Sequence, residues 1–138
     1  MFDCKIVSLQ KKEEFIEDLR KYLQEFPEIV FAYIFGSFLT DFPFQDVDIA
    51  VYVSKKHEMS YYDYKEQYAD MLGIAFKEVF DVVIINNAPT PIIYSIFSEG
   101  RLIFCRDEIL LSQWIETCTL DMLANEDLSL ESLREIVQ

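Results

Sequence analysis

YIFGSFLTDFPFQDVDIAVYV, residues 33–53, decides how the chain folds, because it contains two apolar runs separated by a polar segment. Gly36 and Ser37 follow the first run, and Asp46 and Asp48 stand at the head of the second. Both runs are rich in β-branched and aromatic residues, which is typical of buried strands. Asp is disfavoured in strands, and two ionised carboxylates that face the same space repel each other. Their presence at a strand entrance therefore needs a chemical explanation.

The composition favours one globular domain, 1–138, because 138 residues with 51% hydrophobic content can form one sizeable core. No apolar run reaches the about 18 residues of a membrane span, and the N-terminus lacks the apolar centre of a signal peptide, so we expect a cytoplasmic protein without a membrane partner. Twelve basic against 25 acidic residues give a net charge of −13, which opposes direct nucleic-acid binding. Three scattered cysteines and one histidine predict neither a disulfide framework nor a zinc site.

Hydrophobic periodicity predicts helices that alternate with strands. The expected strands, all of them buried or apolar, are 29–35, 47–53, 81–86 and 101–105. The first expected helix is capped by Ser8 and ends near Pro27, and the second begins at the capping box Ser60–Asp63 and has an apolar stripe from Tyr61 to Val79. A short helix from Thr90 and Pro91 to Gly100 and one or two helices within 107–138 complete the prediction. This order predicts an α/β (α+β) sheet domain with its core in about residues 10–105 and C-terminal helices in 107–138.

The Gly-Ser pair and the Asp-x-Asp pair each suggest a ligand. A turn at Gly36 lets a phosphate approach the main chain, and Ser37 adds a hydroxyl donor. Asp46 and Asp48 point to the same face of an extended chain, with Cα atoms about 6.5 to 7 Å apart. A hard divalent cation, Mg²⁺ or Mn²⁺, removes the repulsion between them. Taken singly, each pair is commoner in ordinary solvated turns.

Asp81 supplies a third carboxylate at the start of another apolar run, 33 residues after Asp48 and with one helix between them. A crossover helix of that length returns the chain beside the first strands, so Asp81 can reach the same sheet edge. Three carboxylates near a phosphate-binding turn are what metal-assisted phosphoryl or nucleotidyl transfer requires. The order strand, Gly-Ser, Asp-x-Asp, strand, helix and Asp-strand therefore predicts a catalytic site.

With these motifs the chain resembles the minimal nucleotidyltransferases of the DNA polymerase β-like superfamily, especially the MNT antitoxins paired with HEPN toxins. The resemblance is carried by Gly36-Ser37, Asp46-Val47-Asp48 and Asp81, and it extends through VVIINNAPTPIIYSIFSEGRLIFCRDE to cover about residues 10–110. It implies a nucleotidyltransferase fold, a small mixed β-sheet flanked by helices with a helical C-terminus.

The resemblance also implies roles for the motif residues. Gly36 and Ser37 would bind the triphosphate of ATP. Asp46 and Asp48 would hold two Mg²⁺ or Mn²⁺ ions, and Asp81 would complete the catalytic metal site and help deprotonate the acceptor. The implied activity is metal-dependent transfer of AMP from ATP to a tyrosine of a partner HEPN toxin. Two other functions stay open: an antitoxin that neutralises its partner by binding alone, and a transferase for a small hydroxylated molecule. The sequence does not decide between a monomer and a homo-oligomer.

The loop FLTDFPFQ, residues 38–45, contains no basic side chain, although a triphosphate favours positive charge nearby. Either triphosphate affinity is reduced, or Lys55, Lys56 or the partner supplies the charge. Phe42 and Phe44 could stack on adenine or contact a partner, but aromatic side chains more often cover a sheet edge.

Overall fold

The computed structural model describes residues 8–40, 45–56 and 58–124, and its four strands form one mixed sheet in the order β3-β2-β1-β4. The strands are β1 (Ile29–Phe35), β2 (Asp46–Val53), β3 (Val79–Ile84) and β4 (Arg101–Cys105). β1 is antiparallel to both β2 and β4, whereas β2 and β3 are parallel. The parallel pair is joined by a helix, as the length of the connection predicted.

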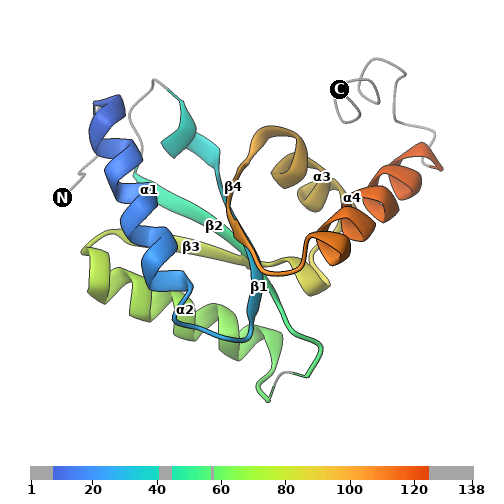
Figure 1. Ribbon diagram of the computed structural model, residues 1–138, viewed down its shortest axis with the longest axis horizontal. Coiled ribbons are helices and arrows are strands. Elements are labelled where there is room, and N and C mark those ends of the chain that lie inside the picture. Colours follow the sequence, from blue (N-terminus) through green and yellow to red (C-terminus); the bar gives the residue numbers. More distant parts are fainter. Residues whose placement is uncertain (1–7, 41–44, 57, 125–138) are drawn as a thin grey trace.

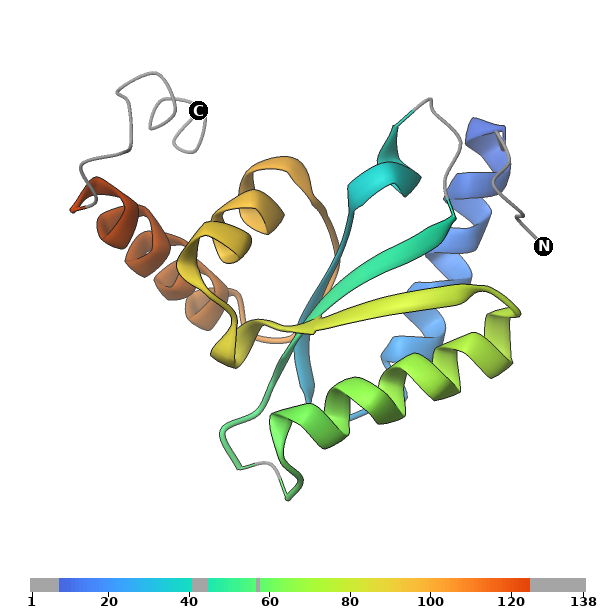
Figure 2. The ribbon, with the colours of Figure 1, turned by 180° about the vertical axis from the view of Figure 1, so that it is seen from behind.

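Helices cover both faces of this sheet (Figures 1 and 2). They are α1 (Leu9–Leu23), α2 (Tyr61–Phe76), α3 (Thr90–Glu99) and α4 (Glu108–Leu123), with short 3₁₀ turns η1 (Gly36–Leu39) and η2 (Ile85–Asn87). One apolar core joins α1 and α2 to the sheet, and a second joins α3 and α4 to the opposite face. No helix in the described part of the chain is long and apolar enough to cross a membrane.

The alternation of side chains along β2 decides where its carboxylates lie. Val47, Ile49 and the later odd-numbered residues belong to the core under α1 and α2, while Ala50 and Tyr52 belong to the core under α3 and α4. Because side chains two residues apart share a face, Asp46 and Asp48 lie on the α3 and α4 side of the sheet. They occupy the end of that face where the strand begins.

Capping explains the predicted helix starts at Ser8 and Ser60 and the predicted stop at Gly100, whereas α1 ends at Leu23, before the expected end near Pro27. The Ser8 hydroxyl accepts a hydrogen bond from the Lys11 amide, and the Ser60 hydroxyl accepts one from the Asp63 amide. Gly100 follows the last residue of α3, and its amide donates to the Ile96 carbonyl. These side-chain and backbone bonds satisfy groups that a helix end would otherwise leave unpaired.

Three expectations need correction. Val79 does not continue the apolar stripe of α2, because the helix ends at Phe76 and Val79 is the exposed first residue of β3. β3 is also not a buried strand: it lies at the edge of the sheet, and its first four residues alternate between exposed and buried. Ile85 and Asn86, which were expected in this strand, form a 3₁₀ turn. α4 confirms the first part of the helical prediction for 107–138, while Cys4, Phe42, Phe44 and the rest of that prediction, 125–138, lie outside the described residues.

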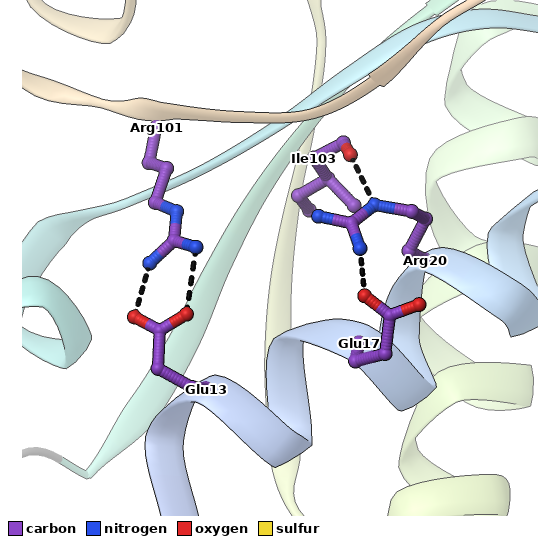
Figure 3. Close-up of polar contacts among 5 residues, drawn as sticks. All are labelled: Glu13, Glu17, Arg20, Arg101 and Ile103. Atoms are coloured by element: carbon purple, nitrogen blue, oxygen red, sulfur yellow. Dashed lines mark hydrogen bonds and ion pairs between the residues drawn. The ribbon is translucent and has the colours of Figure 1, made fainter. Parts of the chain in front are cut away.

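Polar contacts fasten α1 to the edge strand β4 (Figure 3). The Arg101 guanidinium donates to both carboxylate oxygens of Glu13, at 2.6 and 2.7 Å. Two turns further along α1, Arg20 donates to the Ile103 carbonyl at 2.7 Å and pairs with Glu17. The two contacts fix the position of α1 along the sheet, close to the end of β1 where Gly36 follows.

Candidate active site

The three sequence-predicted carboxylates come together on one face of the sheet. Asp48 in β2 is directly paired with Asp81 in β3 across the parallel ladder, and Asp46 precedes Asp48 by two residues on the same face. Asp46 and Asp81 are exposed, while Asp48 is partly buried between them and the end of β1. The parallel register therefore brings together residues that are 33 positions apart.

The pKa of Asp48 reflects its burial and the two neighbouring carboxylates. Its pKa is raised from 3.8 to about 6, first because burial disfavours the carboxylate and then because Asp81 and Asp46 repel it. A cation placed among the three side chains would relieve both effects. The carboxylate set thus has the charge and the oxygen donors that Mg²⁺ or Mn²⁺ requires.

The side-chain geometry of these three aspartates differs from that of a metal site. Within residues 8–40, 45–56 and 58–124, no group of three or more His, Cys, Asp or Glu side chains meets the geometry of a metal site. The backbone register places the aspartates on neighbouring positions, while the exposed side chains of Asp46 and Asp81 remain able to rotate. Backbone placement and donor chemistry fit a divalent cation, and the side-chain geometry in this structure does not yet enclose one.

Gly36 lies against the central carboxylate. It has a φ of +78°, in the left-handed region, and a Cβ built at this position would be only 2.1 Å from Asp48 Oδ2. A side chain at position 36 would therefore carry backbone strain and would also displace Asp48. The glycine predicted to admit a phosphate therefore lies directly against the carboxylate of Asp48.

Three sets of contacts stabilise the turn after Gly36. The Phe38 side chain is fully buried against Phe15, with ring centroids 5.2 Å apart. The Thr40 hydroxyl and amide both donate to the Ser37 carbonyl, at 2.8 and 3.1 Å. Lys12 of α1 donates to the carbonyls of Phe38 and Thr40, at 2.7 and 2.8 Å. Ser37 is thus held beside Gly36 by a structured turn.

The cation that contacts this turn comes from α1. Lys55 and Lys56 follow the last residue of β2, at the opposite end of the strand from Asp46 and Asp48. Lys12 reaches the turn from α1, a helix whose sequence showed only an amphipathic pattern. No local signal could have identified it, because the contact joins residues 26 and 28 positions apart.

A separate cavity of about 350 Å³ lies along the exposed edge of β3. It is bounded by the first turn of α2, by β3 just after Asp81 and by the segment that leads into α3; its lining residues include Tyr61, Tyr62, Lys65, Val83 and Ile92. The lining is mostly apolar and contains no carboxylate, so this cavity is not the carboxylate site.

The family model described as "Polymerase beta, Nucleotidyltransferase" matches residues 17–109. The chain belongs to this family. The matched segment is two-thirds of this nucleotidyltransferase and includes Gly36, Ser37 and the three aspartates. None of the curated proteins matches the sequence.

Solved structures with a similar fold include toxin-antitoxin complexes. A crystal structure of the toxin-antitoxin MntA-HepT aligns with a TM-score of 0.60 at 19% identity, covering 83% of this nucleotidyltransferase and 93% of that chain. A tri-AMPylated Shewanella oneidensis HEPN toxin in complex with MNT antitoxin gives 0.55 at 20% identity, covering 83% and 95%. A toxin-antitoxin with AMP-PNP gives 0.53 at 17% identity, covering 81% and 97%. These matches establish the nucleotidyltransferase fold over most of the chain.

Proposed function

We propose that this nucleotidyltransferase is the antitoxin of a toxin-antitoxin pair and transfers AMP from ATP to a tyrosine of a partner HEPN toxin. The observation that carries the proposal is the parallel register that sets Asp48 beside Asp81, with Asp46 on the same face. Family membership supports nucleotidyl transfer as the reaction class. The tri-AMPylated HEPN toxin among the similar structures supports a HEPN toxin as the acceptor of AMP.

The proposed reaction is an in-line displacement at the α-phosphorus of ATP. The tyrosine oxygen forms a bond to that phosphorus, the bond to the β-phosphate oxygen breaks, and pyrophosphate leaves. Asp81 is exposed at the sheet edge, where it can accept the tyrosine proton or pass it to water. Gly36 and Ser37 border the site and hold the triphosphate through backbone amides and the Ser37 hydroxyl.

Asp46, Asp48 and Asp81 are the residues that would hold divalent cations. Two Mg²⁺ or Mn²⁺ ions, when bound, neutralise the triphosphate and lower the pKa of the attacking hydroxyl. The raised pKa of Asp48 supports this assignment, because it reflects partial burial first and then repulsion from Asp81 and Asp46, and a bound cation would offset that repulsion. The chain's own contribution is to fix carboxylates on two adjacent strands before a ligand binds.

The partner is inferred from similarity and charge together. The net charge of −13 opposes direct binding to RNA or DNA, so a protein partner fits the chain better. The small domain leaves the acceptor to be positioned by docking of a second protein. We place the pair in the cytoplasm, where ATP is available.

Co-expression with the candidate HEPN toxin tests the proposal. The intact mass of the purified toxin should increase by one or more AMP groups with wild-type protein, and should not change with Asp48→Asn. Asp70→Asn on the outer surface of α2 is the matched control, because it removes the same charge away from the site. A toxin that is bound and neutralised with no mass increase would instead establish an antitoxin that acts by binding alone. Transfer to a small hydroxylated compound and never to the toxin would establish the third function.

A further inference from the structure

We propose that Lys12 is a positioning residue for nucleotide binding: its ammonium group holds residues 36–40 in the conformation that presents Gly36 and Ser37 to the triphosphate. The role in binding rests on the proposed function, since it requires ATP as the ligand. The role in holding the turn rests on the contacts of Lys12 alone.

The contacts of Lys12 close the C-terminal end of η1. Its Nζ donates to the Phe38 carbonyl at 2.7 Å and to the Thr40 carbonyl at 2.8 Å, and it lies 5.2 Å from the centroid of the Phe38 ring. Carbonyls at the end of a helical turn point outward and carry partial negative charge. The Lys12 ammonium group thus contacts two carbonyl oxygens and one aromatic face.

The turn depends on contacts with a neighbouring element, because its own sequence supplies little rigidity. Gly36 has no side chain to restrict its backbone, and the 38–45 loop contains no basic residue. Within the turn, Thr40 bonds to the Ser37 carbonyl, which fixes the segment locally but does not attach it to a neighbouring element. Lys12 and the buried ring of Phe38 provide that attachment, both of them toward α1.

Helix α1, which carries Lys12, is itself held in place by contacts with its neighbours. Glu13, the next residue, is held by Arg101 of β4 through two hydrogen bonds, as Figure 3 shows. Phe15 is buried in the core and contacts Phe38 directly. Helix α1 therefore connects the edge strand β4 to the turn, and a lysine held in this way is better organised than one on a free surface.

The expected consequence is a change in nucleotide affinity more than in chemistry. Lys12 contacts the carbonyl groups of Phe38 and Thr40, whereas the three carboxylates that would carry the reaction lie on β2 and β3. Losing it should loosen Gly36 and Ser37 while leaving Asp46, Asp48 and Asp81 in place. The KM for ATP should rise about tenfold, the size expected when one charged hydrogen-bond donor is lost, whereas kcat should change less than about threefold.

The experiment compares Lys12→Met, Lys12→Arg and Lys11→Met in the full chain. Lys11→Met is the matched control, since Lys11 is the exposed neighbour on the same turn of α1. Three measurements are made: KM and kcat for AMP transfer to the co-expressed toxin, binding of an α,β-methylene ATP analogue with Mg²⁺ by calorimetry, and amide hydrogen exchange over residues 36–40. Lys12→Met should show the higher KM, about tenfold weaker binding and about tenfold faster exchange in the turn. Lys12→Arg should restore most of each, because a guanidinium can also donate to two carbonyls.

The outcomes separate this inference from the proposed function. If the wild-type protein neither binds the analogue nor transfers AMP, the proposed function fails, and exchange in the turn still decides whether Lys12 holds it. Unchanged exchange in Lys12→Met would overturn the positioning role. Faster exchange with an unchanged KM would overturn the role in nucleotide binding. A Lys12→Met protein with lowered thermal stability, reduced kcat and unchanged KM would reveal a purely structural lysine.

Discussion

Asp48 and Asp81 are direct partners in the parallel ladder between β2 and β3. The pairing puts two carboxylates on the same face of adjacent strands, at a place where neither backbone can move away from the other. Asp48 is partly buried there and its pKa rises to about 6, so the native fold holds an electrostatic conflict. Strain of this kind at a site is typical of residues kept for chemistry rather than for stability.

Asp48→Asn should therefore stabilise the metal-free protein while it abolishes AMP transfer. The amide keeps the size of the side chain but removes the repulsion with Asp81 and Asp46, which should add about 1 kcal/mol to the free energy of unfolding at pH 7.5 after allowance for solvent screening. Urea unfolding and the intact mass of the toxin measure the two effects. Lower stability in Asp48→Asn, with Asp70→Asn unchanged, would contradict the electrostatic interpretation.

The same conflict predicts a pH dependence. The pKa of Asp48 is higher in the folded protein than its ordinary value of 3.8, so the native state binds the proton more tightly than the unfolded chain does. The contribution of Asp48 to stability is therefore fully present below about pH 4 and is lost as the pH rises through about 6. Urea unfolding of wild type and Asp48→Asn between pH 4 and pH 7.5 should show curves that diverge over this window. Parallel curves would show that the pKa of Asp48 is not raised.

Magnesium should reverse the loss of stability at higher pH. A cation that binds only the native protein adds about 2.7 kcal/mol to the free energy of unfolding at one hundred times its dissociation constant. Because Asp48 must be ionised to bind the cation, Mg²⁺ should raise the Tm more at pH 7.5 than at pH 5, and EDTA should remove the increase. Asp48→Asn should show little increase at either pH. An equal Mg²⁺ effect in wild type and variant would place the cation elsewhere.

Gly36→Ala should damage the site and the fold together. The alanine would hold a φ near +78°, which is strained, and its Cβ would collide with Asp48 Oδ2. We expect a loss of about 2 kcal/mol of stability and of most AMP transfer. Gly73→Ala in α2 is the matched control: its Cβ would meet no atom closer than 3.4 Å, and helix propensity predicts a gain of up to about 1 kcal/mol. Equal changes of stability and of AMP transfer in the two variants would contradict the close approach of Gly36 to Asp48.

Two buried tyrosines should respond oppositely to loss of the hydroxyl. Tyr52 is 1% exposed and its hydroxyl has no hydrogen-bond partner among the described residues, so Tyr52→Phe should be neutral or stabilising by about 1 kcal/mol. The Tyr68 hydroxyl donates to the Glu28 carboxylate, so Tyr68→Phe should cost about 1 to 2 kcal/mol. Thermal unfolding of both variants measures the difference. A destabilised Tyr52→Phe protein would indicate that the hydroxyl has a partner after all.

Local patterns predicted most of the elements because short-range chemistry governs them. The strand 29–35 and the caps at Ser8 and Ser60 follow from β-branched runs and from side-chain acceptors at helix starts. The same reasoning failed at Val79, where the apolar spacing of α2 continues by chance into β3. Periodicity reports which residues are apolar and does not report where the backbone turns out of the helix.

The sequence by itself determined the kind of site: Gly-Ser after one strand, Asp46 and Asp48 at the head of the next, and Asp81 in a third, with a chain length between them that suits a crossover helix. Only the tertiary structure decided the register that pairs Asp48 with Asp81, the position of β3 at the sheet edge and the contact of Lys12 with the turn after Gly36. The physical reason is distance along the chain. Residue spacing sets which side chains share a face within one strand, whereas contacts between elements depend on how two cores pack on opposite faces of one sheet.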